Sequence, residues 1–131
     1  MVTDSEYRIL ASVRAELRRF ARFTETNTRK VGLTPQQHQV LLAIRASDNR
    51  QMTVGELAET MLLEPHSISG IADRLGKLGF VERKRCDRDR RQVILRVTQR
   101  AERVLSSLAE VHRAELRRIR PLLVTLLAEL T

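Results

Sequence analysis

The chain has 131 residues, a length that suits one domain or one domain with helical extensions. Its 24 Lys and Arg residues outnumber its 16 Asp and Glu, and the net charge of +8 favours a polyanionic partner, either nucleic acid or an anionic membrane surface. The single cysteine excludes an intramolecular disulfide framework, and no apolar stretch reaches the roughly 18–20 residues that span a bilayer.

The N-terminal part of the chain combines a polar start with a long periodic segment. Residues 1–6 lack the apolar region of a signal peptide, so we expect a cytoplasmic protein. Residues 5–30 predict an amphipathic helix, because apolar side chains recur three and four positions apart. Gly32 then ends the helical pattern.

Three shorter helices are predicted next, each with a start signal. Thr34 with Gln37, and Thr53 with Glu56, have the spacing of capping boxes. Pro65 suits the first position of a helix that runs to about Leu78. The inner stripe of this fourth helix is expected to consist of Ile68, Ile71, Ala72, Leu75 and Leu78. Gly79 follows as a C-terminal stop.

Residues 80–85 and 92–97 predict the two strands of a hairpin. Val93, Leu95 and Val97 alternate onto one face of the second strand. The connecting turn, residues 86–91, is too charged to be buried. We expect Asp87 and Asp89 to pair with neighbouring Arg residues, as in bidentate arginine–carboxylate contacts, and so to fix their directions.

The last predicted segment is helical and begins with Thr98 as N-cap. Pro121 is expected to kink or break this helix, or to start a sixth one. The fold class is therefore mainly α (α+β), a winged helix-turn-helix with N- and C-terminal dimerisation helices. The expected domains are an N-terminal dimerisation helix at 1–33, a DNA-binding domain at 34–98 and C-terminal dimerisation helices at 99–131.

The helix at 65–78 and the hairpin at 81–97 together predict binding of double-stranded DNA. Small side chains near the start of the helix would let it enter a major groove about 12 Å wide, and arginine at a hairpin tip suits the minor groove. The alternatives are that His66 is exposed but does not contact DNA, and that the charged turn is simply solvated. The predicted DNA-binding residues are Pro65, His66, Ser67, Ser69, Gly70, Arg74, Lys84, Arg85, Arg88, Asp89, Arg90 and Arg91.

The terminal helices carry apolar stripes that a domain at 34–98 cannot cover. We expect them to cover each other across a two-fold homodimer, with two recognition helices about 34 Å apart on a palindromic site. A larger monomeric fold is the alternative. The predicted dimerisation residues are Ile9, Leu10, Val13, Leu17, Leu116, Ile119, Leu122, Leu123 and Leu126.

Several motifs, in order, resemble the MarR family of bacterial transcription regulators. They are residues 32–37 before the second helix, 53–58, 73–75 with 79–83, the D-x-R motif at 89–91, and 95–98. The resemblance implies an obligate homodimer that represses nearby genes from a palindrome and is released by a phenolic or other small molecule. It also implies that Asp89 and Arg91 form the wing pair, with Arg91 in the minor groove.

The chain departs from the family pattern at several positions. Glu64 replaces a better helix cap, Gly70 replaces a longer side chain, and residues 99–101 lack a frequent glycine. The C-terminal helices are also short for the family. By resemblance, an effector pocket would lie where the first, second and fifth helices meet the DNA-binding lobe, with ordinary packing as the alternative reading. Its candidate lining is Phe20, Phe23, His38 and Arg45.

Two other functions compete with DNA binding. A winged helix can serve as a protein-interaction module, with arginines that bind an acidic partner. A metal-dependent nuclease site at His66, Asp87 and Asp89 is opposed by the surrounding arginines, and we expect no enzyme activity, no metal and no cofactor. Cys86 is either a bystander or a redox-sensitive thiol.

Overall fold

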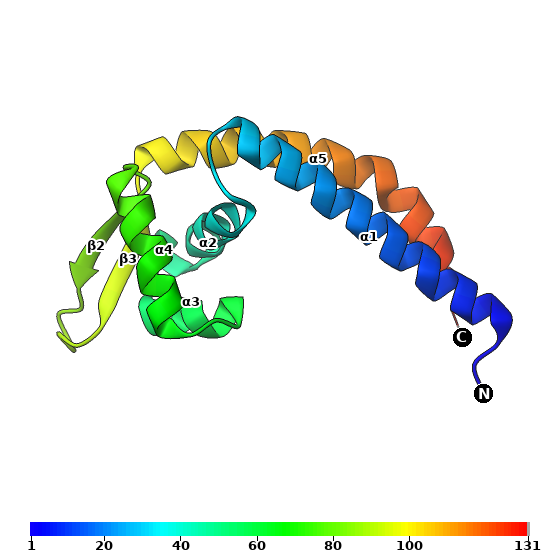
Figure 1. The fold of residues 1–131 in the computed structure, drawn as a ribbon, viewed down its shortest axis with the longest axis horizontal. Coiled ribbons are helices and arrows are strands. Elements are labelled where there is room, and N and C mark those ends of the chain that lie inside the picture. Colours follow the sequence, from blue (N-terminus) through cyan, green and yellow to red (C-terminus); the bar gives the residue numbers. More distant parts are fainter. Residues whose placement is uncertain (131) are drawn as a thin grey trace.

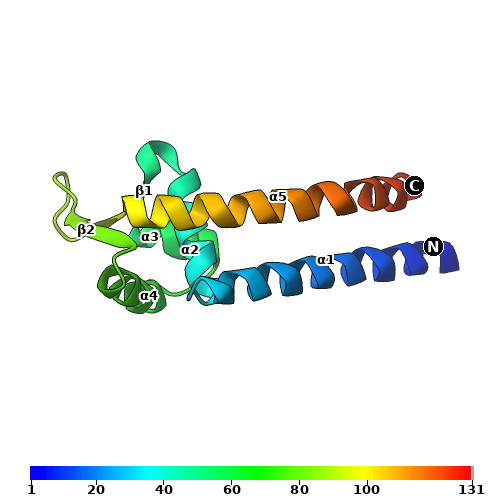
Figure 2. The ribbon, with the colours of Figure 1, turned by 90° about the horizontal axis from the view of Figure 1, so that it is seen from above.

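The computed structural model describes residues 1–130 and has two parts (Figure 1). One is a compact lobe, and the other is a pair of long helices, α1 (Asp4–Lys30) and α5 (Gln99–Ala128), that extends away from it. These two helices run antiparallel and side by side, so both chain ends lie far from the hairpin (Figures 1 and 2). This arrangement confirms the predicted class, a mainly helical winged helix-turn-helix.

The lobe contains three α-helices, a short 3-10 helix and a small antiparallel sheet of strand order β1-β3-β2. In the hairpin, Val81 is paired with Val97 at the base and Arg85 with Val93 near the tip. Strand β1 lies on the other side of β3, where Met52 pairs with Leu95. The lobe's elements are α2 (Pro35–Ala46), the 3-10 helix η1 (Asp48–Arg50), β1 (Gln51–Thr53), α3 (Val54–Met61), α4 (Pro65–Lys77), β2 (Val81–Arg85) and β3 (Val93–Val97).

Local capping explains why most helices begin where the sequence predicts. Thr34 Oγ1 accepts the Gln37 N–H at 3.1 Å, and the Gln37 side chain accepts the Thr34 N–H at 3.0 Å, so this capping box is complete. The box at Thr53 is half formed, because Glu56 Oε1 accepts from the Thr53 hydroxyl instead of its backbone. Helix α4 has no side-chain cap at Glu64 and begins with Pro65 alone.

The core of the lobe is almost entirely aliphatic and includes residues from α2, α3, α4 and α5. Leu41, Leu57, Leu75 and Leu95 are fully buried at its centre. The first turns of α5 belong to the same core through Ala101 and other buried residues, so this helix starts inside the lobe. The predicted domain boundaries at residues 33/34 and 98/99 stay a prediction.

Three details of the fold differ from the sequence prediction. Residues 51–53, where the sequence predicted no strand, form strand β1. Of the three outcomes predicted for Pro121, a break and a sixth helix are wrong, because Pro121 lies within one continuous helix that curves along its length (Figure 1). Leu78 is 40% exposed because it follows the last turn of α4, where the chain leaves the inner stripe.

The predicted dimerisation residues fall into two groups. Ile9 is 3% exposed and Ile119 is 2% exposed, so these two pack within the chain, where α1 meets α5. The others are exposed or half-buried on the helix pair. Leu10, Leu17, Leu116 and Leu122 are exposed, and Val13, Leu123 and Leu126 are half-buried. The helix pair therefore buries part of its apolar surface within the single chain and exposes the rest to solvent.

Candidate nucleic-acid interface

Helix α4 presents a polar face to solvent near its N-terminus. Its buried stripe, which includes Ile68, Ala72 and Leu75, packs into the lobe. The opposite face carries the small and polar side chains that sequence analysis selected. Pro65, His66, Ser67, Gly70 and Arg74 are exposed, and Ser69 is half-buried. This geometry matches a helix whose outer face is free to enter a groove.

The second set of predicted residues lies at the end of β2, with Lys84 and Arg85, and in the turn between β2 and β3, residues 86–92. Asp89 Oδ1 accepts both the backbone N–H of Arg91, at 3.0 Å, and its side-chain Nε–H, at 3.2 Å. The Arg91 side chain is nevertheless 92% exposed, so its direction is fixed while it remains open to a partner. Arg85 Nη1 donates to the Arg90 carbonyl at 2.7 Å and supports the same turn.

The expected pairing of the two aspartates is only partly right. Asp89 binds Arg91 through one oxygen, because a carboxylate two residues before a backbone N–H readily forms such a local turn. The contact is therefore not bidentate. Asp87 faces Lys84 at 3.9 Å instead of an arginine, and its side chain is 91% exposed. Among the described residues, Asp89 therefore fixes the direction of an arginine in the turn, and Asp87 does not.

A groove of about 260 Å³ joins α3, α4 and the hairpin. Arg91 reaches it from the turn, and Pro65 and Ser69 reach it from the first turns of α4. An ion pair between Arg83 on β2 and Asp73 on α4 also connects the hairpin to the helix. The lining of the groove consists of Thr53, Val54, Gly55, Pro65, Ser69, Arg91, Gln92 and Val93. The helix and the hairpin thus form one continuous surface.

Three of the four candidate effector-pocket residues lie around one histidine of α5, and the fourth, Arg45, lies further along α2. Phe20, Phe23 and His38 surround His112 of α5, with ring centroids 6.5, 6.4 and 5.3 Å from it. Arg45 is two helical turns from His38 along α2, which places it about 10 Å away along the helix axis. The grouping of Arg45 with the three aromatic residues stays a prediction.

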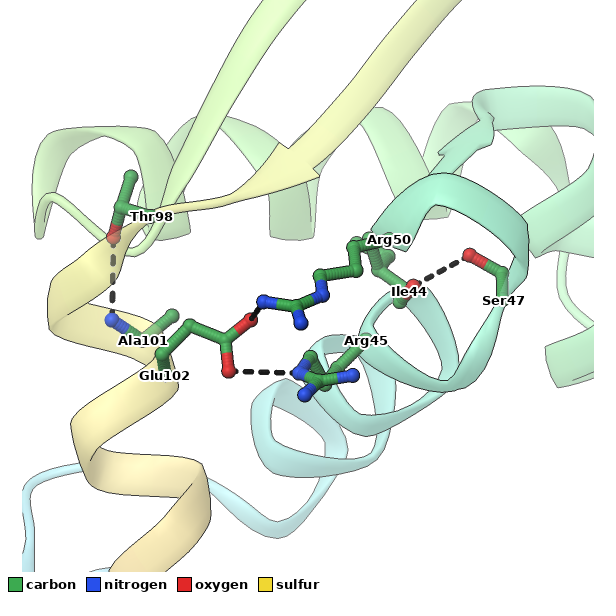
Figure 3. A network of polar contacts seen from close by, with 7 residues as sticks. All are labelled: Ile44, Arg45, Ser47, Arg50, Thr98, Ala101 and Glu102. Carbon is green, nitrogen blue, oxygen red and sulfur yellow. Dashed lines mark hydrogen bonds and ion pairs between the residues drawn. The ribbon is translucent and has the colours of Figure 1, made fainter.

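Arg45 belongs to a polar network between α2, η1 and α5 (Figure 3). Its Nε lies 2.7 Å from one carboxylate oxygen of Glu102, and Arg50 Nη1 lies 3.2 Å from the other. Glu102 comes from the first turn of α5 and points between the two arginines (Figure 3). This network was not predicted, because Glu102 is distant in sequence from both Arg45 and Arg50.

His38 and His112 are both buried, and burial lowers the pKa of each imidazole. The proximity of His112 lowers the pKa of His38 further, because two adjacent positive charges repel. His112 Nε2 is buried without a hydrogen-bond partner among the described residues. Both rings therefore stay neutral at pH 7 and act as packed aromatic groups.

Metal binding and membrane insertion are two further possibilities raised by the sequence that the described residues address. Within residues 1–130, no three His, Cys, Asp or Glu side chains lie close enough to hold a metal ion. The helices in this range also lack the length and apolar character needed to cross a membrane.

Comparison with known proteins gives matches in sequence and in fold. Residues 31–92 match the sequence model of the MarR family. The HTH-type transcriptional regulator YfiV of Bacillus subtilis is 31% identical over 89 residues, which are 68% of this chain. The match spans only 54% of that relative, so this chain corresponds to about half of it.

Two solved structures from Streptomyces coelicolor have the same fold. AbsC, a MarR family transcriptional regulator, is 23% identical with a TM-score of 0.76, and the match covers 90% of this chain and 80% of AbsC. Sco3205, a MarR family regulator in complex with DNA, is 22% identical with a TM-score of 0.73, and the match covers 90% of this chain and 75% of Sco3205. The two structures share the fold, and the sequence match at residues 31–92, the relative YfiV and the motifs of α3, α4 and the hairpin show that the chain belongs to the MarR family.

Proposed function

We propose that the protein is a transcription regulator that binds a palindromic double-stranded DNA site as a homodimer and represses nearby genes. The observation that carries this proposal is the groove shared by Arg91 and the first turns of α4. One surface there presents a helix of the right width for a major groove beside arginines suited to the adjacent minor groove. The net charge of +8 supports the same partner.

Relatives support the proposal. Sco3205 is described in complex with DNA, and the relative YfiV is described as a transcriptional regulator. The expectation that the chain is not an enzyme agrees with membership of a family of regulators. The homodimer is supported by the exposed leucines of the α1–α5 pair. Release by a small aromatic molecule is a further part of the proposal, and the cluster around His112 is where such a ligand would contact this chain.

The direct experiment selects duplexes from a random DNA library with the wild-type protein and then measures their affinity by fluorescence anisotropy. A triple variant, Arg88, Arg90 and Arg91 to Ala, should bind the selected duplex at least about a hundredfold more weakly. The slope of log K against log salt should fall by up to about 3, because three cationic contacts are lost.

The matched control removes three exposed arginines distant from the groove, Arg22, Arg29 and Arg103. It lowers the net charge equally, so it separates a contact from a general electrostatic effect. Equal affinities of the two triple variants would show that the hairpin does not touch DNA. Failure of the wild type to retain any duplex at low salt would favour the alternative, a winged-helix module that binds an acidic protein.

A further inference from the structure

The exit of α4 is a tightly hydrogen-bonded corner. The Phe80 N–H donates to the Leu75 carbonyl at 2.9 Å, and the Gly79 N–H donates to the Gly76 carbonyl at 3.0 Å. This pattern is a Schellman motif, and Gly79, with φ of +80°, supplies the left-handed residue that it requires. The motif turns the chain directly from α4 into β2.

Three consecutive carbonyls of this corner, those of residues 78–80, accept hydrogen bonds from the start of α5. The Leu78 carbonyl accepts Arg100 Nη1–H at 2.7 Å, and the Gly79 carbonyl accepts the Thr98 hydroxyl at 2.7 Å. The Phe80 carbonyl accepts the Thr98 backbone N–H at 3.1 Å. These five residues, 78–80 with Thr98 and Arg100, are called the α4–α5 junction below.

Arg100 makes a second contact within the junction. Its guanidinium carbon lies 4.8 Å from the centre of the Phe80 ring, and Phe80 is itself 3% exposed. A planar cation can stack on an aromatic face and donate in its own plane at the same time, which a lysine cannot do. Its positive charge also lies at the C-terminal end of α4, where the helix dipole favours a cation.

Thr98 connects the two helices through one hydroxyl group. Its Oγ1 accepts the Ala101 N–H at 3.2 Å and thereby caps α5, while the same hydroxyl donates to Gly79. The cap of one helix is thus hydrogen-bonded to the terminating residue of the other. A change in the direction of α5 must move the end of α4 and the base of β2, or break these bonds.

We propose that Arg100 and Thr98 are positioning residues for DNA recognition, which couple the long helix α5 to α4 and the hairpin. The inference rests on the proposed function, because it assumes that α4 reads a DNA site. Arg100 acts through the Leu78 carbonyl and the Phe80 ring, and its role needs no contact with DNA. Through the junction, the angle of α5 sets the angle at which α4 meets the duplex.

The test compares Arg100→Ala with Arg103→Ala, which removes the same charge from an exposed position one turn further along α5. Each variant is titrated against the duplex selected by the wild type and against a scrambled duplex of equal length. Arg100→Ala should lose about tenfold in affinity for the selected duplex relative to Arg103→Ala. The two variants should bind the scrambled duplex equally, because that binding depends on phosphate charge.

The salt dependence of binding distinguishes a positioning role of Arg100 from a direct contact between Arg100 and a phosphate. The slope of log K against log salt should be the same for Arg100→Ala and Arg103→Ala. A slope lower by about 1 in Arg100→Ala, with equal losses on both duplexes, would make Arg100 a phosphate contact and overturn the inference. Equal affinity of the two variants for the selected duplex would overturn it as well.

A conservative variant allows the inference to be tested even if Arg100→Ala does not fold. Arg100→Lys keeps a donor and a cation but loses the planar stack on Phe80, so its affinity for the selected duplex should lie between those of the wild type and Arg100→Ala. If Arg100→Ala does not fold, as judged by its urea midpoint, wild-type affinity of Arg100→Lys contradicts the inference and a partial loss supports it. A wild type that prefers neither duplex overturns the proposed function itself, a result that differs from all of these.

Discussion

The carboxylate of Asp89 accepts two N–H groups of Arg91, and the arginine side chain stays exposed. Asp89→Ala should therefore weaken binding to the selected duplex, although it makes the protein more basic. The loss of the two contacts corresponds to about 1 kcal/mol, or roughly a fivefold change in affinity. Anisotropy titrations of the selected duplex measure this effect.

Asp87→Ala is the matched control, because it makes the same charge change in the same turn without releasing an arginine. It should leave affinity unchanged or raise it slightly. If both variants gained affinity equally, Asp89 would act only as a negative charge and would have no part in the direction of Arg91.

The buried His38 and His112 predict a pH dependence of stability. Both have a folded-state pKa below the ordinary value near 6.5, chiefly because burial disfavours the charged ring. The unfolded chain therefore binds more protons as the pH falls. The free energy of unfolding should be largest above about pH 6.5. It should decrease as the pH falls toward the folded-state pKa values and level off below them.

Urea unfolding of His112→Phe at pH 7.5, 6.5 and 5.5 checks this prediction. The phenyl ring fills the same aromatic site and leaves no orphaned nitrogen, so this variant should lose less stability on acidification than the wild type. His66→Gln is the control, since His66 is exposed. A wild-type slope retained in His112→Phe would assign the acid sensitivity to other groups.

Residue roles were predictable where their causes are local. The Asp89–Arg91 pair lies within three residues, and the cap at Thr34 lies within four, so short-range spacing is sufficient. The contact between His38 and His112 depends on how α2 and α5 pack. Periodicity places each histidine on its own helix but does not say which residue it meets.

Helix α5 is the clearest case of an element whose length could not be predicted from its sequence, because of Pro121. A proline inside a helix costs about 3 kcal/mol relative to alanine, yet α5 continues through it. Buried contacts of α5 before the proline, such as those of Ile119, offset part of that cost and are not visible in a local pattern. Strand β1 was missed for a related reason, because three residues become a strand only through pairing with β3.

Pro121→Ala should therefore raise the stability of the protein, by up to about 3 kcal/mol. Ser107→Ala, an exposed helical position of the same helix, should gain only about 0.5 kcal/mol. Chemical denaturation followed by circular dichroism measures both. A loss of stability in Pro121→Ala would mean that the curvature of α5 is needed for its packing.

The proposed homodimer depends on the apolar surface that the helix pair leaves open. Leu116, Leu123 and Leu127 line a groove of about 350 Å³ on α5, together with Val124 and three arginines. Leu116 is 48% exposed in the single chain, so a substitution there should spare the fold. Leu116→Asp should shift the protein from dimer to monomer, because a buried charge would face the partner.

Sedimentation equilibrium over a range of protein concentrations measures this change. Leu62→Asp replaces an equally large leucine that is 90% exposed in the turn between α3 and α4, and it should leave the association state unchanged. An unaltered dimer in Leu116→Asp would place the interface elsewhere on the molecule.

The unbroken length of α5 has a mechanical consequence. Its 30 residues span about 45 Å at 1.5 Å per residue, and its first turn is bonded to the exit of α4. In the proposed dimer it works as a lever arm, so a tilt of about 5° at one end displaces the other by about 4 Å. That displacement is close to the 3.4 Å rise of one base pair. The tolerance of the protein for operators with one base pair inserted between half-sites would therefore report how stiff this arm is.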